Sequence, residues 1–186
     1  MQNMPPMLAY TLQGGIASKA APRITIGQGP TKKVVYPATP ADDSYWIAIL
    51  DANNPTNKVK EFVVPGSSNS AVPSGLDTYM SNPAYLFAVV TQSLSMLHVP
   101  QGAFYDYLAA HGAGRQLQRV EQINTSLGCG QISYLSYALT GQGGPAHTGV
   151  AYEVSSTTSG VMILMSLMPL PSGPPYSLCD TYTFNH

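Results

Sequence analysis

Apolar residues recur along this chain in short runs of strand length. Prominent runs lie at 44–50, 84–91, 132–139 and 161–168, and β-branched and aromatic residues are frequent in them. The run AYLFAVVT at 84–91 is almost entirely apolar, which is typical of a strand buried on both faces. Clusters of glycine, proline, serine and asparagine separate the runs. The pattern therefore predicts a β-rich protein.

A different spacing marks a helix at 102–111. Apolar and aromatic side chains recur every three to four residues between Phe104 and His111, so they form one stripe along a helix. Gly112 is a typical helix stop, and a second, weaker helical pattern follows at 115–124. We therefore expect an α+β protein of two packed β-sheets, sandwich-like, with one or two short helices at the side.

The two ends of the chain differ in composition from the segment between them. Residues 1–44 are rich in proline, glycine, alanine and threonine, and 169–186 opens with a Pro/Gly-rich stretch. This organisation predicts an N-terminal arm or set of edge strands at 1–44, a β-sandwich domain at 45–168 and a C-terminal arm at 169–186. The core of the domain is expected to contain Trp46, Ile47, Ile49, Leu86, Phe87, Val89, Phe104, Leu108, Tyr137, Leu139, Ile163 and Leu164.

Charged residues make up only 9% of the chain, against about 25% in ordinary globular proteins. Eight Lys and Arg against nine Asp and Glu give a formal net charge of −1, and no basic run is dense enough to neutralise a row of phosphates. We therefore expect no nucleic-acid binding. A polar, uncharged surface repels other proteins weakly, which favours packing into assemblies. The longest apolar run, at 161–170, is about half a membrane span, so no membrane span is expected.

Motifs of catalysis and metal binding are scarce. Cys129 lies between two glycines, and His147 is the nearest histidine, but a cysteine hydrolase would need the two side chains in contact. The histidines and cysteines lack short metal-ligand spacings, so neither a metal nor another cofactor is expected. Cys129 and Cys179 would pair in an oxidising compartment and remain thiols in a reducing one, and the sequence leaves both states open.

Residues 45 to about 153 resemble the ILEI/PANDER-like domain, which occurs in cytokine-like secreted proteins and in the stem of a Golgi glycosyltransferase. The matching segments are YWIAILDANNPTNKVKEFVV, LDTYM, AYLFAVVTQS, FYDYLAAHGAG, ISYLSYALTGQGG and GVAYE. The sequence departs from the family pattern at Leu76, where an aromatic residue is usual, at Thr91, where aspartate is usual, and at His111, where leucine is usual. The family's cysteines do not map onto Cys129 and Cys179.

This resemblance implies a compact β-sandwich-like fold without enzymatic activity. Because some members bind glycans, it also implies a candidate carbohydrate site. Its contacts would be Asp77, Thr78, Tyr79, Thr91 and Gln92.

The function predicted first is a non-enzymatic structural or interaction module, a subunit or decoration protein of a larger extracellular or virion-type assembly. Its partners would be other copies of itself or other assembly proteins, held by the two arms. A carbohydrate-binding domain is the alternative, and a cysteine hydrolase using Cys129 and His147 is the second alternative. Residues 1–10 show no signal-peptide pattern.

Overall fold

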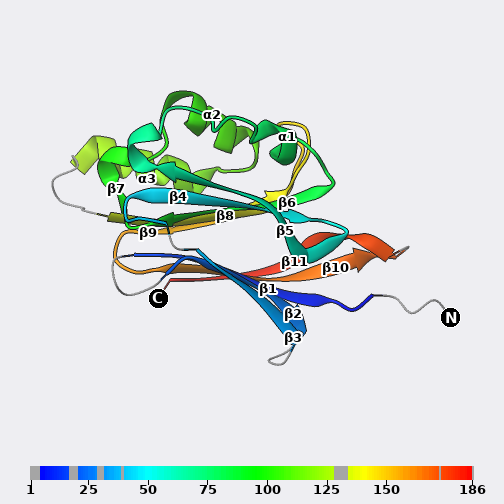
Figure 1. The fold of residues 1–186 in the computed structure, drawn as a ribbon. Coiled ribbons are helices and arrows are strands. Elements are labelled where there is room, and N and C mark those ends of the chain that lie inside the picture. The colour runs from blue at the N-terminus through cyan, green and yellow to red at the C-terminus, as the bar shows by residue number, and fades with distance from the viewer. Residues whose placement is uncertain are drawn as a thin grey trace.

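The computed structural model describes residues 5–16, 21–28, 32–38, 40–127, 134–171 and 173–185. Two antiparallel sheets are stacked face to face, and helices cover the outer side of one of them (Figure 1). Strands hold 52% of the residues and helices 19%, which confirms the predicted β-rich, sandwich-like class.

Sheet A is built from both ends of the chain. Its strand order is β11-β10-β1-β2-β3, and β1 pairs with β10 on one side and with β2 on the other. The N-terminal segment therefore supplies the central strand of a sheet as well as the edge strand β3. The prediction of an arm or edge strands at 1–44 thus applies to β3 but not to the central β1, and the sandwich takes strands from 1–44, 45–168 and 169–186 alike. The strands are β1 (Leu8–Gly14), β2 (Arg23–Gln28), β3 (Lys32–Pro37), β10 (Val161–Leu170) and β11 (Gly173–Asn185).

Sheet B lies between sheet A and the helices. Its strand order is β5-β4-β6-β8, and the short strands β7 and β9 both pair with β8. Both faces of its central strands β4, β6 and β8 are buried, which explains the continuous apolar runs of these strands. Its strands are β4 (Ser44–Asp51), β5 (Asn54–Pro65), β6 (Tyr85–Gln92), β7 (Leu94–Ser95), β8 (Tyr134–Gln142) and β9 (Ala151–Ser156).

Alternate residues of sheet B enter two separate cores. Trp46 of β4 packs between the sheets, whereas its neighbours Tyr45 and Ile47 pack under the helices. The predicted core residues are buried, with the exception of Leu164. Leu164 points away from sheet B because residues of β10 alternate, and Ile163 takes the inward position. The apolar sequence of β10 does not show which alternate set faces inward.

The helices form a layer on sheet B (Figure 1). The predicted helix at 102–111 is confirmed, and the second runs three residues beyond its predicted end at 124. Gly112 has φ +99°, and a Cβ there would lie 2.4 Å from the Cβ of Ala151, so glycine is required. None of the described helices is long and apolar enough to cross a membrane. The layer contains η2 (Gly66–Ser68), α1 (Asp77–Met80), η3 (Met96–His98), α2 (Gly102–Ala110) and α3 (Arg115–Leu127).

Candidate functional site

A polar cluster lies where α1 meets the end of α2. Asp77 accepts hydrogen bonds from the Ser81 hydroxyl at 2.5 Å and from the Tyr107 hydroxyl at 3.4 Å. The Nδ1 of His111 lies 2.9 Å from the Tyr107 carbonyl oxygen, and its Nε2 lies 3.5 Å from the Ser81 Oγ. Burial, and then the Asp77 carboxylate, raise the pKa of the Tyr107 phenol above its usual range. Asp77, one predicted carbohydrate contact, is therefore already engaged by two hydroxyl groups.

This cluster has the side-chain types of a serine nucleophile and base, but its hydrogen bonds serve another purpose. Ser81 lies closer to Asp77 than to His111, so its proton is directed to the carboxylate. Nearby backbone amides that could stabilise an oxyanion are occupied, since Gly143 N donates to Tyr85 O and Gly144 N to Met80 O. The geometry therefore fits a contact that fixes α1 against α2.

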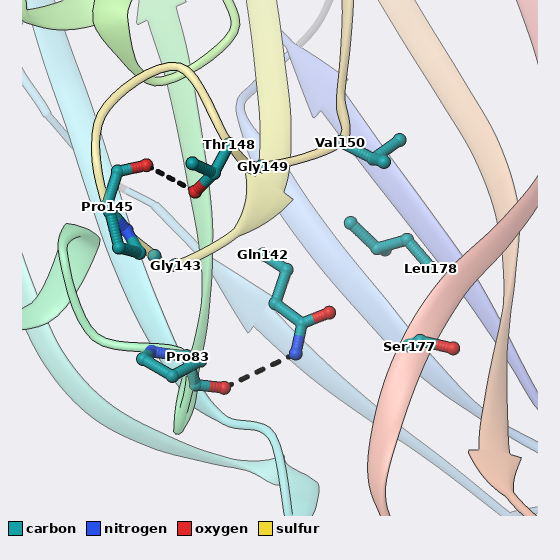
Figure 2. A pocket seen from close by; sticks show the side chains of 10 residues that line it. Pro83, Gln142, Gly143, Pro145, Thr148, Gly149, Val150, Ser177 and Leu178 are labelled. Carbon is teal, nitrogen blue, oxygen red and sulfur yellow. Dashed lines mark hydrogen bonds between the residues drawn. The ribbon is translucent and has the colours of Figure 1, made fainter.

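A pocket of about 310 Å³ opens at Pro83, in the turn that follows α1 (Figure 2). Gln142 of β8 lies opposite Ser177 and Leu178 of β11, and its Nε2 donates to Pro83 O at 3.3 Å. The volume is at the lower end of the range for small-molecule sites. The lining residues are all uncharged: Pro83, Gln142, Gly143, Gly144, Pro145, Thr148, Gly149, Val150, Ser177 and Leu178.

The loop that forms one wall of the pocket also carries His147. The backbone N–H of His147 donates to Ala110 O at 2.6 Å, so this residue helps to hold the loop against α2. Cys129 lies outside the described residues, so the distance from Cys129 to His147 stays open. Cys179 lies in β11, where its Sγ donates to Ser166 O at 3.4 Å. The two predicted states of Cys129 and Cys179, a disulfide or two thiols, both stay predictions.

The predicted carbohydrate residues divide between the two ends of β6. Tyr79 packs against Tyr85 at the start of the strand, with 5.3 Å between ring centroids. Six residues farther on, about 20 Å along the strand, Thr91 is fully buried and its Oγ1 accepts a hydrogen bond from Tyr137 N at 2.9 Å. Gln92 follows Thr91, and its Nε2 donates to Asp42 at 3.0 Å. Asp77, Thr78 and Tyr79 on α1 are thus not brought together with Thr91 and Gln92.

Asp43, which is not among the predicted site residues, organises the second end of β6. Its Oδ2 lies 2.6 Å from His98 Nδ1, and its Oδ1 accepts from Ser95 N at 2.9 Å. Its backbone also bonds to Gly66 and Gln92, and its φ is +61°, an unusual value for a residue other than glycine. The Asp42-Asp43 pair in a turn was the available signal. This cluster ties β4, η2, β6 and η3 together.

The outer face of sheet A has no covering layer among the described residues (Figure 1). It is formed by the residues of β1, β2, β3 and β10 that alternate with the core residues. Directly paired positions form a row across the sheet, from Leu164 through Thr11 and Thr25 to Val35. Exposure on this face reaches 45% for Met168 and 41% for Val35. The outward residues are Ala9, Thr11, Gln13, Arg23, Thr25, Gly27, Lys33, Val35, Met162, Leu164, Ser166, Met168 and Leu170.

Charge is sparse on this face. Among the outward side chains just named, Arg23 and Lys33 are the charged ones, and both lie toward the β3 edge. Arg23 is already bonded to Gln13 Oε1 at 2.9 Å.

Comparison of the chain with family models, with curated proteins and with solved structures finds no match. The resemblance to the ILEI/PANDER-like domain therefore stays a prediction.

Proposed function

We propose that this chain is a non-enzymatic structural or interaction module, a subunit or decoration protein of a larger extracellular or virion-type assembly. Its interface is the outer face of sheet A. The observation that carries the proposal is that β10, VMILMSLMPL, is apolar on both faces, yet the described chain buries only its inner face.

The other continuous apolar strands support this interpretation. β4 and β6 have comparable sequences, and both of their faces are buried, one against sheet A and the other under the helices. By analogy with β4 and β6, the apolar outer face of β10 indicates a cover other than the described residues, although an antiparallel sheet can in general leave one face in water. Contiguous exposed apolar surface on a soluble protein commonly marks an interaction site. The low charge of the whole chain also favours close packing of subunits.

The interface differs in location from the arms predicted from composition. Pro6 O accepts a hydrogen bond from the Tyr176 hydroxyl at 3.1 Å, and β1 is paired on both sides. The described parts of both chain ends thus lie along their own sandwich. Assembly through the face of sheet A needs neither end to leave it.

A photo-cross-linking amino acid at Met168 tests the proposal in the natural source of the protein. We expect one reproducible adduct to a structural component of the assembly, identified by mass spectrometry. The matched control places the same group at Leu97, which is 60% exposed on the helix-covered side of the molecule. Equal adducts from both positions, or none from Met168, would contradict the proposed interface.

Carbohydrate binding is the second candidate function, and the pocket beside α1 favours it. Its uncharged lining combines amide and hydroxyl groups with aliphatic surface, which suits a neutral polyhydroxylated ring. Asp77 lies at this end of the molecule, whereas Thr91 does not. NMR titration of the isotopically labelled chain with a panel of monosaccharides is the test. Shifts should affect Gln142 and Ser177, and Ser177→Trp should abolish them; no shifts at millimolar sugar would remove this candidate.

A further inference from the structure

We infer that the partner on the outer face of sheet A is a second copy of this chain, packed face to face about a two-fold axis parallel to the strands. This inference rests on the proposed function and names the partner for the same surface. Three properties of the face support it: its area, the small side chains at its centre and the placement of its charges.

The area matches one side of a stable interface. The five strands of sheet A, at a spacing of about 4.8 Å, give a width of about 24 Å, and its four shorter strands, of six to ten residues, rise about 3.3 Å per residue. The face therefore measures about 500–800 Å². A standard protein interface buries about 800 Å² on each partner, so the full face of one copy would be occupied by the full face of another.

Small side chains occupy the middle of the face. Ala9 pairs with Ser166 on one side and with Gly27 on the other, so three small residues lie side by side across β10, β1 and β2. The neighbouring row consists of Thr11, Thr25 and larger apolar side chains at each end. A centre of small, uncharged side chains with larger apolar side chains on either side suits the aligned stacking of one sheet on another. A helix of another protein would leave much of this breadth uncovered.

The charges decide the direction of the axis. An axis parallel to the strands through β1 lays β2 and β3 of one copy over β10 and β11 of the other. Lys33 is then distant from its counterpart, and its aliphatic stem and that of Arg23 face the methionine-rich side. An axis perpendicular to the strands would lay β3 on β3 and bring like charges together, which is unfavourable.

Light scattering coupled to size-exclusion chromatography tests the dimer with the purified full chain. We expect a mass of twice 19.7 kDa at high micromolar concentration and dissociation on dilution. Met168→Lys and Val35→Lys should each weaken the dimer about 100-fold, because a two-fold axis applies every substitution twice at about tenfold each. Leu97→Lys and Val150→Lys are matched controls, since these residues are also exposed, at 60% and 62%. Both controls should leave the dimer intact.

The orientation is tested by a photo-cross-linker at Val35 in a mixture of ¹⁴N- and ¹⁵N-labelled copies. Adducts between unlike copies should contain peptides of β10 or β11, whereas adducts to β3 would overturn the stated axis. A monomer at every concentration would overturn the second copy as partner. If Met168 still gave its adduct in the natural source, the proposed function would stand with another protein as partner. If it gave none, both proposals would fail. A dimer that resists both Met168→Lys and Val35→Lys would place the contact elsewhere and overturn the inference.

Discussion

A buried chain of hydrogen bonds connects the two sheets, and it allows a quantitative test of the structure. The Tyr10 hydroxyl of β1 lies 2.9 Å from Thr140 Oγ1 of β8, which donates to Phe87 O of β6 at 2.8 Å. Because the Thr140 proton is directed to the carbonyl, Tyr10 must be the donor to Thr140. Both side chains are almost fully buried, so water cannot replace either partner.

Substitutions at the two positions should have unequal and non-additive effects. Thr140→Val keeps the side-chain volume but leaves the Tyr10 hydroxyl without an acceptor, which should lower the free energy of unfolding by about 1–3 kcal/mol. Tyr10→Phe removes one bond and leaves Thr140 bonded to Phe87, so its cost should be about 0.5–1.5 kcal/mol. The double variant removes the stranded hydroxyl. It should therefore cost less than the sum of the single changes, by about 1 kcal/mol.

Urea unfolding followed by the fluorescence of Trp46, the single tryptophan of the chain, gives the three free energies. Thr78→Val is the matched control: Thr78 is exposed on α1, and its change should stay within about 0.5 kcal/mol of the unmodified protein. Additive costs in the double variant, or a Thr140→Val variant as stable as the control, would refute the proposed chain of bonds.

Further predictions concern caps, the buried threonine and alkaline pH. The Oε1 of Glu153 accepts hydrogen bonds from two backbone N–H groups at the start of α3, both at 2.8 Å. Glu153→Ala should therefore lower the free energy of unfolding by about 1–2 kcal/mol and speed amide hydrogen exchange in α3. Glu153→Gln should have an intermediate effect. Thr91→Val should leave Tyr137 N–H without its acceptor and lower the free energy of unfolding by about 1–3 kcal/mol in the urea assay; an unchanged value would contradict a structural role. Burial, aided by nearby carboxylates, raises the pKa of Tyr45 and Tyr137 well above 10.0, so the folded chain holds protons that the unfolded chain loses. The stabilisation by these protonated tyrosines is therefore complete below pH 10, and it declines as the pH rises above 10. A free energy of unfolding that stays constant from pH 8 to 11 in urea titrations would contradict this prediction.

The elements that the sequence predicts well are those whose pattern of apolar residues matches the faces that the fold buries. The run at 84–91 became the inner strand β6 because its alternate residues enter two cores, and no polar position interrupts it. The helix at 102–110 was predictable since Phe104 and Leu108 share one buried face. The strands of residues 1–44 were harder to recognise. Each buries one face only, and glycine and proline interrupt the alternation.

The candidate site was less accessible to prediction because distant segments build it. Thr91 and Tyr79 lie twelve residues apart in sequence, but Tyr79 packs at the start of β6 and Thr91 lies near its end. The pocket combines β8 and β11 with the turn before β6, and no short motif marks such a combination. Asp43 acts through a left-handed backbone conformation that the adjacent pair of aspartates indicates only weakly.

The pairing of both chain ends within sheet A also decides how assembly should be tested. A truncated chain of residues 42–168 would lose β1, β2, β3 and β11, which are four of the five strands of the sheet. Trp46, Ala48 and Leu50 would then lose the layer that covers them, and the fragment would associate through its opened core. Loss or gain of oligomers on truncation would therefore report on the core and not on the outer face. Single lysine substitutions at exposed positions such as Met168 leave that core intact, so they separate assembly from folding.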